Sequence, residues 1–394
     1  MSDDPQTIDA AVVQAGCLIN GSGAPARMNV FLTVQDGKIK TVCGVKPRTN
    51  LPLMDLSGHT LLPLLVDSHV HLFMDPAAEG EDRQLQMSAG YKTLAPVIER
   101  HVACYSRYGI VAVRDGGDPG GFAGRYRQSL SAAEQERFTI KTAGRAWYKA
   151  GRYGRIVGGI PVVEKDLVAA VEEASDRVDQ IKLINSGINS LSEFGRQTAP
   201  QFTAEELAAI VALARKKKKR VMVHANGELP VAEAVAAGVD SIEHGFFMGR
   251  ENLERMAEKE VFWVPTAVTM QAFADLGREG GDVAARNLDS QLEQISWARE
   301  AGVRISLGTD AGSPGVAHGA SVRRELMLLT RAGYSTEQAV QAATANGAAL
   351  LGLANAGRLT PGMPADFIAV PGGREDLFRR LKQVSIYRAA RAGR

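Results

Sequence analysis

The sequence of 394 residues predicts an α/β fold: a (β/α)8 TIM barrel with a small β-sandwich domain formed by both chain ends. From residue 61 onward, short apolar runs alternate with longer amphipathic segments, and eight such units fit the size of about 250 residues typical of this barrel. A doubly wound open sheet is the alternative, but no Gly-x-Gly-x-x-Gly fingerprint opens its first helix. Both ends of the chain instead show short strand patterns separated by turn residues.

The eight strand runs are rich in apolar or β-branched residues. They are LLPLLVDSHVHL (61–72), GIVAVRDGG (109–117), FTIKTAGRAW (138–147), QIKLINSG (180–187), RVMVHANG (220–227), SIEHGFF (241–247), VFWVPTAVT (261–269) and VRISLGTDAGS (303–313). Helical periodicity fills the segments between them. One helix is predicted to begin after the N-cap Thr203, with Glu206 three residues later, and another to end at Gly302.

The two ends of the chain are expected to build one small domain. In NVFLTVQDGKIKTVCGV, the dipeptide Asp36-Gly37 between alternating runs predicts a hairpin. Residues 357–373, GRLTPGMPADFIAVPGG, have the same turn-rich character. We therefore expect residues 1–58 and 353–394 to form the small β domain and residues 59–352 to form the barrel.

Composition excludes several classes of protein. A formal net charge of +2 gives no field that would attract nucleic acid. The cysteines Cys17, Cys43 and Cys104 are too few and too widely spaced for a disulfide framework, which fits a reducing compartment. The N-terminus MSDDPQTIDA is acidic and polar, and no apolar run of membrane-spanning length follows. The sequence thus predicts a soluble, cytoplasmic protein with neither nucleic acid nor membrane as a partner.

Six residues suited to metal chemistry fall in or at the ends of the predicted strands. They are His69, His71, Lys182, His224, His244 and Asp310. Active sites of barrels lie at the C-terminal ends of the strands, and residues two apart in a strand point to the same side. His69 and His71 can therefore address one point, as a transition metal such as zinc requires. Lys182 stands out because an ammonium group inside an apolar run is costly to bury.

Several motifs together resemble the amidohydrolase superfamily, in its imidazolonepropionase-like and dipeptidase-like branch. They are DSHVHL, the in-strand Lys182, VMVHANG, SIEHG, LGTDAG and GRLTPGMPADFIAV. The resemblance implies two zinc ions, one held by His69, His71 and Asp310 and the other by His224 and His244. It also implies that carbon dioxide converts Lys182 to a carbamate that bridges both ions.

The same resemblance implies a mechanism and a small-molecule substrate. A hydroxide bridging two zinc ions would hydrolyse a C–N bond in an amide, a peptide-like compound or a cyclic amide. Asp310 would act as general base and then as general acid. For the substrate itself, the sequence offers Tyr148, Arg152, Tyr153, Arg155 and Asn226 as candidate contacts.

Two other functions are weighed against this one. A metal-dependent deaminase of a nitrogen heterocycle would be expected to carry a glutamate at position 227, where this chain has Gly227, with Glu228 one residue later. A non-catalytic barrel would be expected to have lost ligands, and none is missing. The sequence leaves open whether the chain forms a homo-oligomer.

Overall fold

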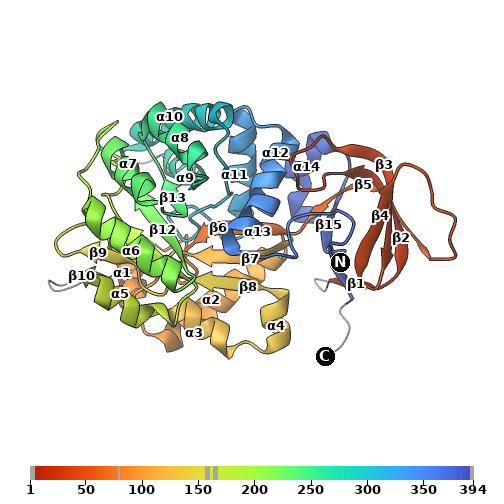
Figure 1. Ribbon diagram of the computed structural model, residues 1–394, viewed down its shortest axis with the longest axis horizontal. Coiled ribbons are helices and arrows are strands. Elements are labelled where there is room, and N and C mark those ends of the chain that lie inside the picture. Colours follow the sequence, from red (N-terminus) through yellow and green to blue (C-terminus); the bar gives the residue numbers. More distant parts are fainter. Residues whose placement is uncertain (1–4, 79, 156–159, 163–166, 278, 391–394) are drawn as a thin grey trace.

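Parallel strands surrounded by helices form the larger part of the protein, and a small sheet lies at one end (Figure 1). The computed structural model describes residues 5–78, 80–155, 160–162, 167–277 and 279–390, so residues 1–4 of the polar N-terminus lie outside it. The predicted α/β class is confirmed.

Two parallel sheets occupy the centre. One has the order β6-β7-β8 and the other β10-β9-β11-β12-β13-β14. Their strands are β6 (Leu65–Val70), β7 (Ile110–Asp115), β8 (Thr139–Thr142), β9 (Trp147–Lys149), β10 (Ile160–Val162), β11 (Gln180–Ile184), β12 (Arg220–Ala225), β13 (Ser241–His244) and β14 (Phe262–Val264). Seven of the eight predicted runs therefore contain a parallel strand.

The eighth predicted run, residues 303–313, is wrong as a strand. It makes only single bridges, from Ile305 to Trp263 of β14 and from Ala311 to Val70 of β6. A regular ladder is interrupted because the N–H of Leu307 donates to the carbonyl of Ala342 at 3.0 Å and the N–H of Thr309 donates to the Asp67 carboxylate at 2.9 Å. The segment nevertheless lies between the two sheets and links them.

The amide of Ser306 in this segment donates to the carbonyl of Trp263 in β14 at 2.9 Å. The amide of Ser68 in β6 donates to the carbonyl of Leu307 at 2.8 Å. On the opposite side, the amide of Asp179 donates to Thr142 of β8 at 2.9 Å, next to β11. The described strands thus form two linked parallel sheets, and the closed eight-stranded barrel is not confirmed.

Helices cover the outer side of these sheets (Figure 1). They are α1 (Gly80–Ser88), α2 (Tyr91–Ser106), α3 (Phe122–Ser129), α4 (Ala132–Arg137), α5 (Leu167–Ser175), α6 (Ala204–Lys216), α7 (Glu228–Ala237), α8 (Gly249–Glu258), α9 (Val268–Asp275), α10 (Gly281–Ala301), α11 (Ala320–Arg331), α12 (Thr336–Gln341), α13 (Gly347–Leu351) and α14 (Leu377–Arg380), with short turns at η2 (Ala342–Asn346), η3 (Arg374–Asp376) and η4 (Leu381–Gln383). Among these described helices, none has the length and hydropathy of a membrane-spanning segment.

Two predicted helix ends are confirmed. At the start of α6, the hydroxyl of Thr203 accepts from the amide of Glu206 at 3.2 Å, while the Glu206 carboxylate accepts from the amide of Thr203 at 2.7 Å. This reciprocal pair satisfies two amides that have no partner within the helix. At the other end, Gly302 closes α10 with a φ of 79°, a backbone conformation that favours glycine.

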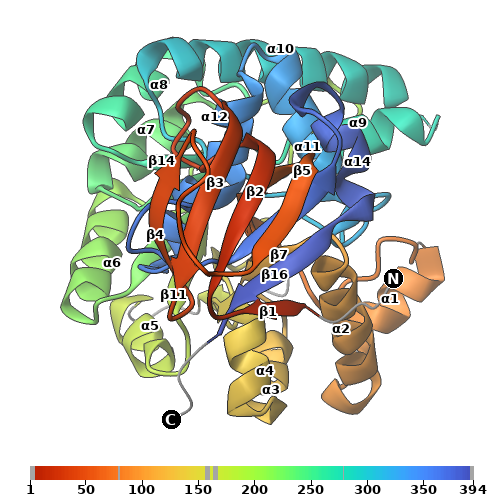
Figure 2. The same ribbon diagram turned by 90° about the vertical axis from the view of Figure 1, so that its right-hand side faces the viewer.

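The small sheet joins the first and last parts of the chain (Figure 2). Its order is β1-β16-β15-β5-β2-β3-β4, with β1 (Gln6–Ile8), β2 (Ala11–Leu18), β3 (Arg27–Gln35), β4 (Lys38–Cys43), β5 (Leu53–Pro63), β15 (Phe367–Pro371) and β16 (Ser385–Ala389). The predicted hairpin at Asp36-Gly37 is confirmed, with φ values of 54° and 66°.

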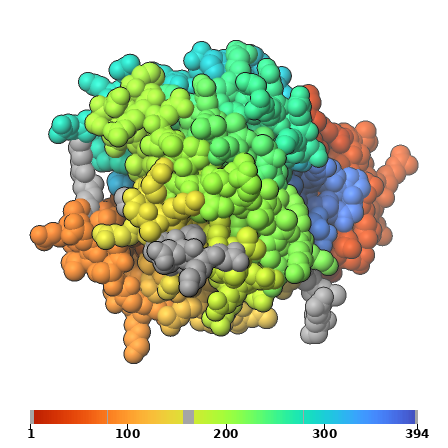
Figure 3. All heavy atoms as spheres, turned by 60° about the vertical axis from the view of Figure 1, so that its left-hand side comes forward, coloured from red at the N-terminus to blue at the C-terminus, as the bar shows by residue number. Residues whose placement is uncertain are grey.

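These strands belong to a single sheet, so a sandwich of two sheets is not confirmed. Strand β5 continues to Pro63, so the first residues of the predicted barrel strand belong to the small sheet. An apolar cluster that includes Val13, Leu32 and Phe367 is buried on this sheet. In Figure 3 the red and blue strands of the sheet lie at the opposite end of the molecule from the orange segment around α1.

The fold generates one prediction about stability. The Asp67 carboxylate of β6 accepts from the amide of Thr309 at 2.9 Å and from its hydroxyl at 2.6 Å, so it attaches the 303–313 segment to β6. The variant Thr309→Val should lower the unfolding free energy by about 1–3 kcal/mol, because a buried carboxylate loses a donor. Chemical denaturation of the metal-free protein measures this. The exposed control Thr93→Val should change stability by less than about 0.5 kcal/mol, and equal losses in both variants would contradict the role of Asp67.

Candidate metal centre

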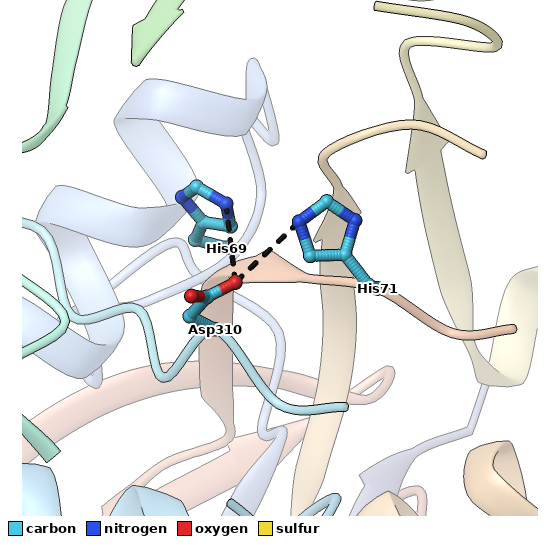
Figure 4. A group of neighbouring side chains, drawn as sticks. All are labelled: His69, His71 and Asp310. Carbon is cyan, nitrogen blue, oxygen red and sulfur yellow. Dashed lines mark ion pairs between the residues drawn. The ribbon is translucent and has the colours of Figure 1, made fainter. Parts of the chain in front are cut away.

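His69, His71 and Asp310 converge at the end of β6 (Figure 4). The Nε2 atoms of the two histidines lie 3.6 and 3.4 Å from Oδ1 of Asp310. One ligand atom from each residue lies within 4.8 Å of the others. Two imidazole nitrogens and a carboxylate oxygen are a donor set that transition metals bind. These three residues can therefore hold a metal ion.

The other predicted ligands share the same cavity. Lys182, His224 and His244 line a cavity of about 260 Å³ together with the first three residues. The ring of His244 lies 4.9 Å from that of His69 and 4.6 Å from that of His224, measured between centroids. The structure thus brings all six predicted residues to one place, although they come from β6, β11, β12, β13 and the 303–313 segment.

Each of the four histidines uses one ring nitrogen in a hydrogen bond that leads away from the cluster. The Nδ1 atoms of His69 and His71 bond the Glu243 carboxylate at 2.7 Å and the carbonyl of Gly117 at 3.0 Å. Nε2 of His224 bonds the carbonyl of Gly187 at 3.0 Å, and Nδ1 of His244 bonds the hydroxyl of Thr266 at 2.8 Å. Metal-binding histidines show this arrangement, because the second nitrogen is then oriented as a ligand.

The histidine nitrogens on the cavity side are suited to a metal. Nε2 of His69 is buried and has no hydrogen-bond partner among the described residues. Burial, followed by the nearby Lys182 charge, lowers the pKa of His71 and of His224 to about 3. Burial and the Lys182 charge also lower the pKa of His69 well below its usual value. These imidazoles are therefore neutral at neutral pH and keep the lone pair that a metal needs.

Lys182 is buried without a partner. Its side chain is 1% exposed, and within the described part of the chain its amine makes no hydrogen bond or ion pair. Burial lowers the pKa of Lys182, and burial raises the pKa of Asp310. A buried amine with no hydrogen-bond acceptor is costly, so this position fits a lysine that bonds to a group in the cavity.

A buried ion pair orients His69 from behind. Arg114 of β7 donates to Glu243 at 2.7 Å and to the carbonyl of Ser68 at 2.6 Å, and both charged side chains are at most 1% exposed. Glu243 in turn accepts from His69. The pair therefore sets which nitrogen of His69 faces Asp310. Arg114 and Glu243 were not among the residues predicted from the sequence, although opposite charges inside two apolar strand runs indicate that they pair in the core.

The backbone around the ligands is constrained. His244, Thr266 and Asp310 have φ values of 67°, 50° and 57°, which are uncommon for residues with a side chain and cluster at functional sites. Gly116 leaves room beside the histidines, since a Cβ there would lie 2.9 Å from Cε1 of His71 and 3.1 Å from Nε2 of His69. A glycine at this position keeps open the space where a metal would lie.

The predicted substrate contacts lie in different places. Tyr153 and Asn226 line the cavity. Tyr148 is buried beneath them, in a cluster with Ile184 and Tyr153. Arg152 is exposed and donates to the carbonyl of Ala199 at 2.8 Å, and neither it nor the exposed Arg155 belongs to the cavity wall.

Comparison with known proteins identifies the family. The sequence profile described as "Amidohydrolase family" matches residues 60–393. The chain belongs to the amidohydrolase family. Membership makes it a hydrolase that acts on carbon–nitrogen bonds, and the resemblance inferred from the sequence motifs is confirmed.

Individual relatives span most of the chain. Ochratoxinase from Aspergillus niger is 28% identical over 404 residues, which cover 91% of this chain and 80% of the relative. An uncharacterised protein of Mycobacterium tuberculosis is 29% identical over 335 residues, 82% of each chain. The crystal structure of a Xaa-Pro dipeptidase with bound methionine superimposes with a TM-score of 0.80 at 27% identity and covers 96% of this chain and 100% of the dipeptidase.

The buried pair behind His69 generates a prediction about metal affinity. The variant Glu243→Gln should weaken zinc binding by about 10- to 100-fold, because the amide no longer fixes the protonated nitrogen of His69. Competition with a chromophoric chelator measures the affinity, and circular dichroism checks the fold. The exposed control Glu258→Gln should bind zinc as the unaltered protein does. Unchanged affinity in a folded Glu243→Gln variant would contradict the positioning role.

The space beside Gly116 generates a second prediction. The variant Gly116→Ala should weaken zinc binding about tenfold or more. The added methyl group would press against the rings of His69 and His71, and overpacking of this kind costs roughly 1–3 kcal/mol. Gly124→Ala is a matched control, since its Cβ would meet only Thr142 at 3.5 Å, an ordinary contact. The same chelator competition compares the two variants, and equal affinities would show that the glycine is not needed for the metal.

Proposed function

We propose that this protein is a binuclear, zinc-dependent amidohydrolase that cleaves a small amide, peptide-like or cyclic amide substrate. One observation carries the proposal: four histidines that line one cavity each bond a protein partner through one ring nitrogen, and the Nε2 atoms of His69 and His71 lie beside Asp310. Packing alone gives no reason for four imidazoles to gather at the ends of β6, β12 and β13, which belong to two different sheets.

The residues present fit two metal ions. We assign His69, His71 and Asp310 to one ion and His224 and His244 to the other, with Lys182 as a carbamate between them. The orphaned Nε2 of His69 and the unpartnered amine of Lys182 support this assignment. Two bound divalent ions would supply a water deprotonated near neutral pH and would polarise the scissile carbonyl.

The remaining steps fall to the chain's own residues. Asp310 is the one carboxylate that lines the described cavity, so we assign to it the proton transfer from water to the leaving nitrogen. Its Oδ2 accepts from the hydroxyl of Ser313 at 3.1 Å, which leaves Oδ1 facing the histidines. Tyr153 and Asn226 are placed to contact the substrate, and the ring of Tyr153 lies 5.3 Å from that of His224.

The deaminase alternative lacks support from the cavity. Within the described residues its wall contains no glutamate, and Glu228 is exposed at the start of α7. The similarity to a dipeptidase and to ochratoxinase supports amide substrates. We also propose that the two linked parallel sheets act as one (β/α)8 barrel, spanning residues 59–352, with residues 1–58 and 353–394 as the second domain.

A substrate screen with metal analysis tests the function. Zinc-loaded protein should hydrolyse members of a panel of N-acyl amino acids, dipeptides and cyclic amides, and a chelator should abolish the activity. About two zinc ions per chain should be present after loading. A single bound metal, together with ammonia release from nitrogen heterocycles and no amide cleavage, would contradict the proposal and favour a deaminase.

Lys182 gives a separate prediction. With ¹³C-bicarbonate, the zinc-loaded protein should show a carbamate resonance, and Lys182→Ala should lose that resonance, one of the two ions and most activity. Because a carbamate forms from carbon dioxide, loading without bicarbonate should recover less activity. As a control, the exposed Lys259→Ala should keep both ions. Two ions and full activity in Lys182→Ala would exclude the carbamate.

A further inference from the structure

Asn189 is a buried polar residue of the cavity wall. It belongs to the loop that follows β11 and is 7% exposed. The same wall contains the apolar side chains of Ile188, Phe246, Met270 and Phe273, together with the hydroxyl of Thr269. A buried carboxamide in such surroundings needs hydrogen-bond partners.

The partners that the protein supplies to Asn189 are insufficient. Its Nδ2 donates only to the sulfur of Met270, at 3.5 Å, and a thioether is a weak acceptor. Within the described residues, no donor bonds its Oδ1. Two other polar side chains of the wall are better satisfied: the hydroxyl of Thr269 donates to the carbonyl of Thr266 at 2.8 Å, and Oδ1 of Asn226 accepts from the amide of Phe246 at 3.0 Å.

The loop holds Asn189 in place. Asn287 of α10 donates to the carbonyl of Ser190 at 2.9 Å, directly after Asn189. At the start of the loop, the amide of Gly187 donates to the hydroxyl of Thr198 at 2.7 Å. Backbone bonds on both sides thus fix the position, so the free hydrogen-bonding capacity of Asn189 is preorganised.

We propose that Asn189 is a specificity residue, which pairs through Oδ1 and Nδ2 with an N–H and a carbonyl on the substrate. A carboxamide can bond a second amide through both atoms at once. The surrounding side chains would contact an apolar group of the substrate, and Ile188, which is 56% exposed, would be covered by it. The substrate class is therefore an amide whose apolar side group is accompanied by a second amide, since the Arg83 guanidinium in the same wall already donates to the carbonyls of Asp75 and Gly312. This inference rests on the proposed function in that the substrate occupies the same cavity.

Binding of two matched compounds tests the inference without requiring turnover. N-acetyl-L-leucinamide and 4-methylpentanamide share an isobutyl group and a terminal carboxamide, and only the first carries a second amide. Calorimetric titration of zinc-loaded protein should show tighter binding of the first by about 3- to 12-fold, the range of a single hydrogen bond. In Asn189→Leu and in Asn189→Ala this preference should vanish, whereas Ser192→Ala, an exposed change in the same loop, should keep it.

Equal affinities in the unaltered protein, or a preference that persists in folded Asn189 variants, would overturn the inference. Binding of neither compound would overturn it as well. Release of ammonia from the terminal carboxamides and of acetate from the N-acetyl group, measured in parallel, separates it from the proposed function. A preference that depends on Asn189, without cleavage of any amide in the panel, supports Asn189 as a specificity residue and counts against the hydrolase assignment.

Discussion

The structure depends on one constraint: every imidazole buried at the ends of the parallel strands needs an acceptor behind it. Glu243, Thr266 and two backbone carbonyls meet this requirement. Burying Glu243 then requires Arg114, because an unpaired carboxylate would be strongly destabilising there. The strands, the loops that follow them and the buried charges are therefore coupled, and their combined effect is to leave one nitrogen of each histidine directed into the cavity.

Periodicity and spacing were sufficient to predict the parts of the site that lie on strands. Seven strand runs and all six proposed ligands could be found because each ligand lies in or beside an apolar run. The run at 303–313 looked equally regular, yet two of its amides, those of Thr309 and Leu307, bond to Asp67 and to Ala342, partners that sequence spacing cannot reveal. Arg114 and Glu243 pair across 129 positions, and Asn189 lies in a loop without periodicity. Such long-range contacts arise only when the fold brings distant strands together.

The cavity divides into two regions with different chemistry. The histidines, Lys182 and Asp310 form a polar end, whereas side chains from α9 and the loop after β11 form an apolar end. The first region fits a reaction at a carbonyl carbon, and the second fits the group attached to it. Asn189 and Thr269 are polar residues within this second region, and the amide of Asn189, whose Nδ2 has only a thioether acceptor, would give it a hydrogen-bonding specificity that apolar contacts alone could not provide.

The orientation of the histidines is the central claim, and locating the metal tests it most directly. Crystals of the zinc-loaded protein can be measured at the zinc absorption edge, where anomalous scattering identifies the metal. We expect one peak about 2.0–2.1 Å from Nε2 of both His69 and His71 and beside Asp310, and a second beside His224 and His244. Zinc bound only elsewhere on the chain, or through the nitrogens that now bond Glu243 and Gly117, would contradict the account.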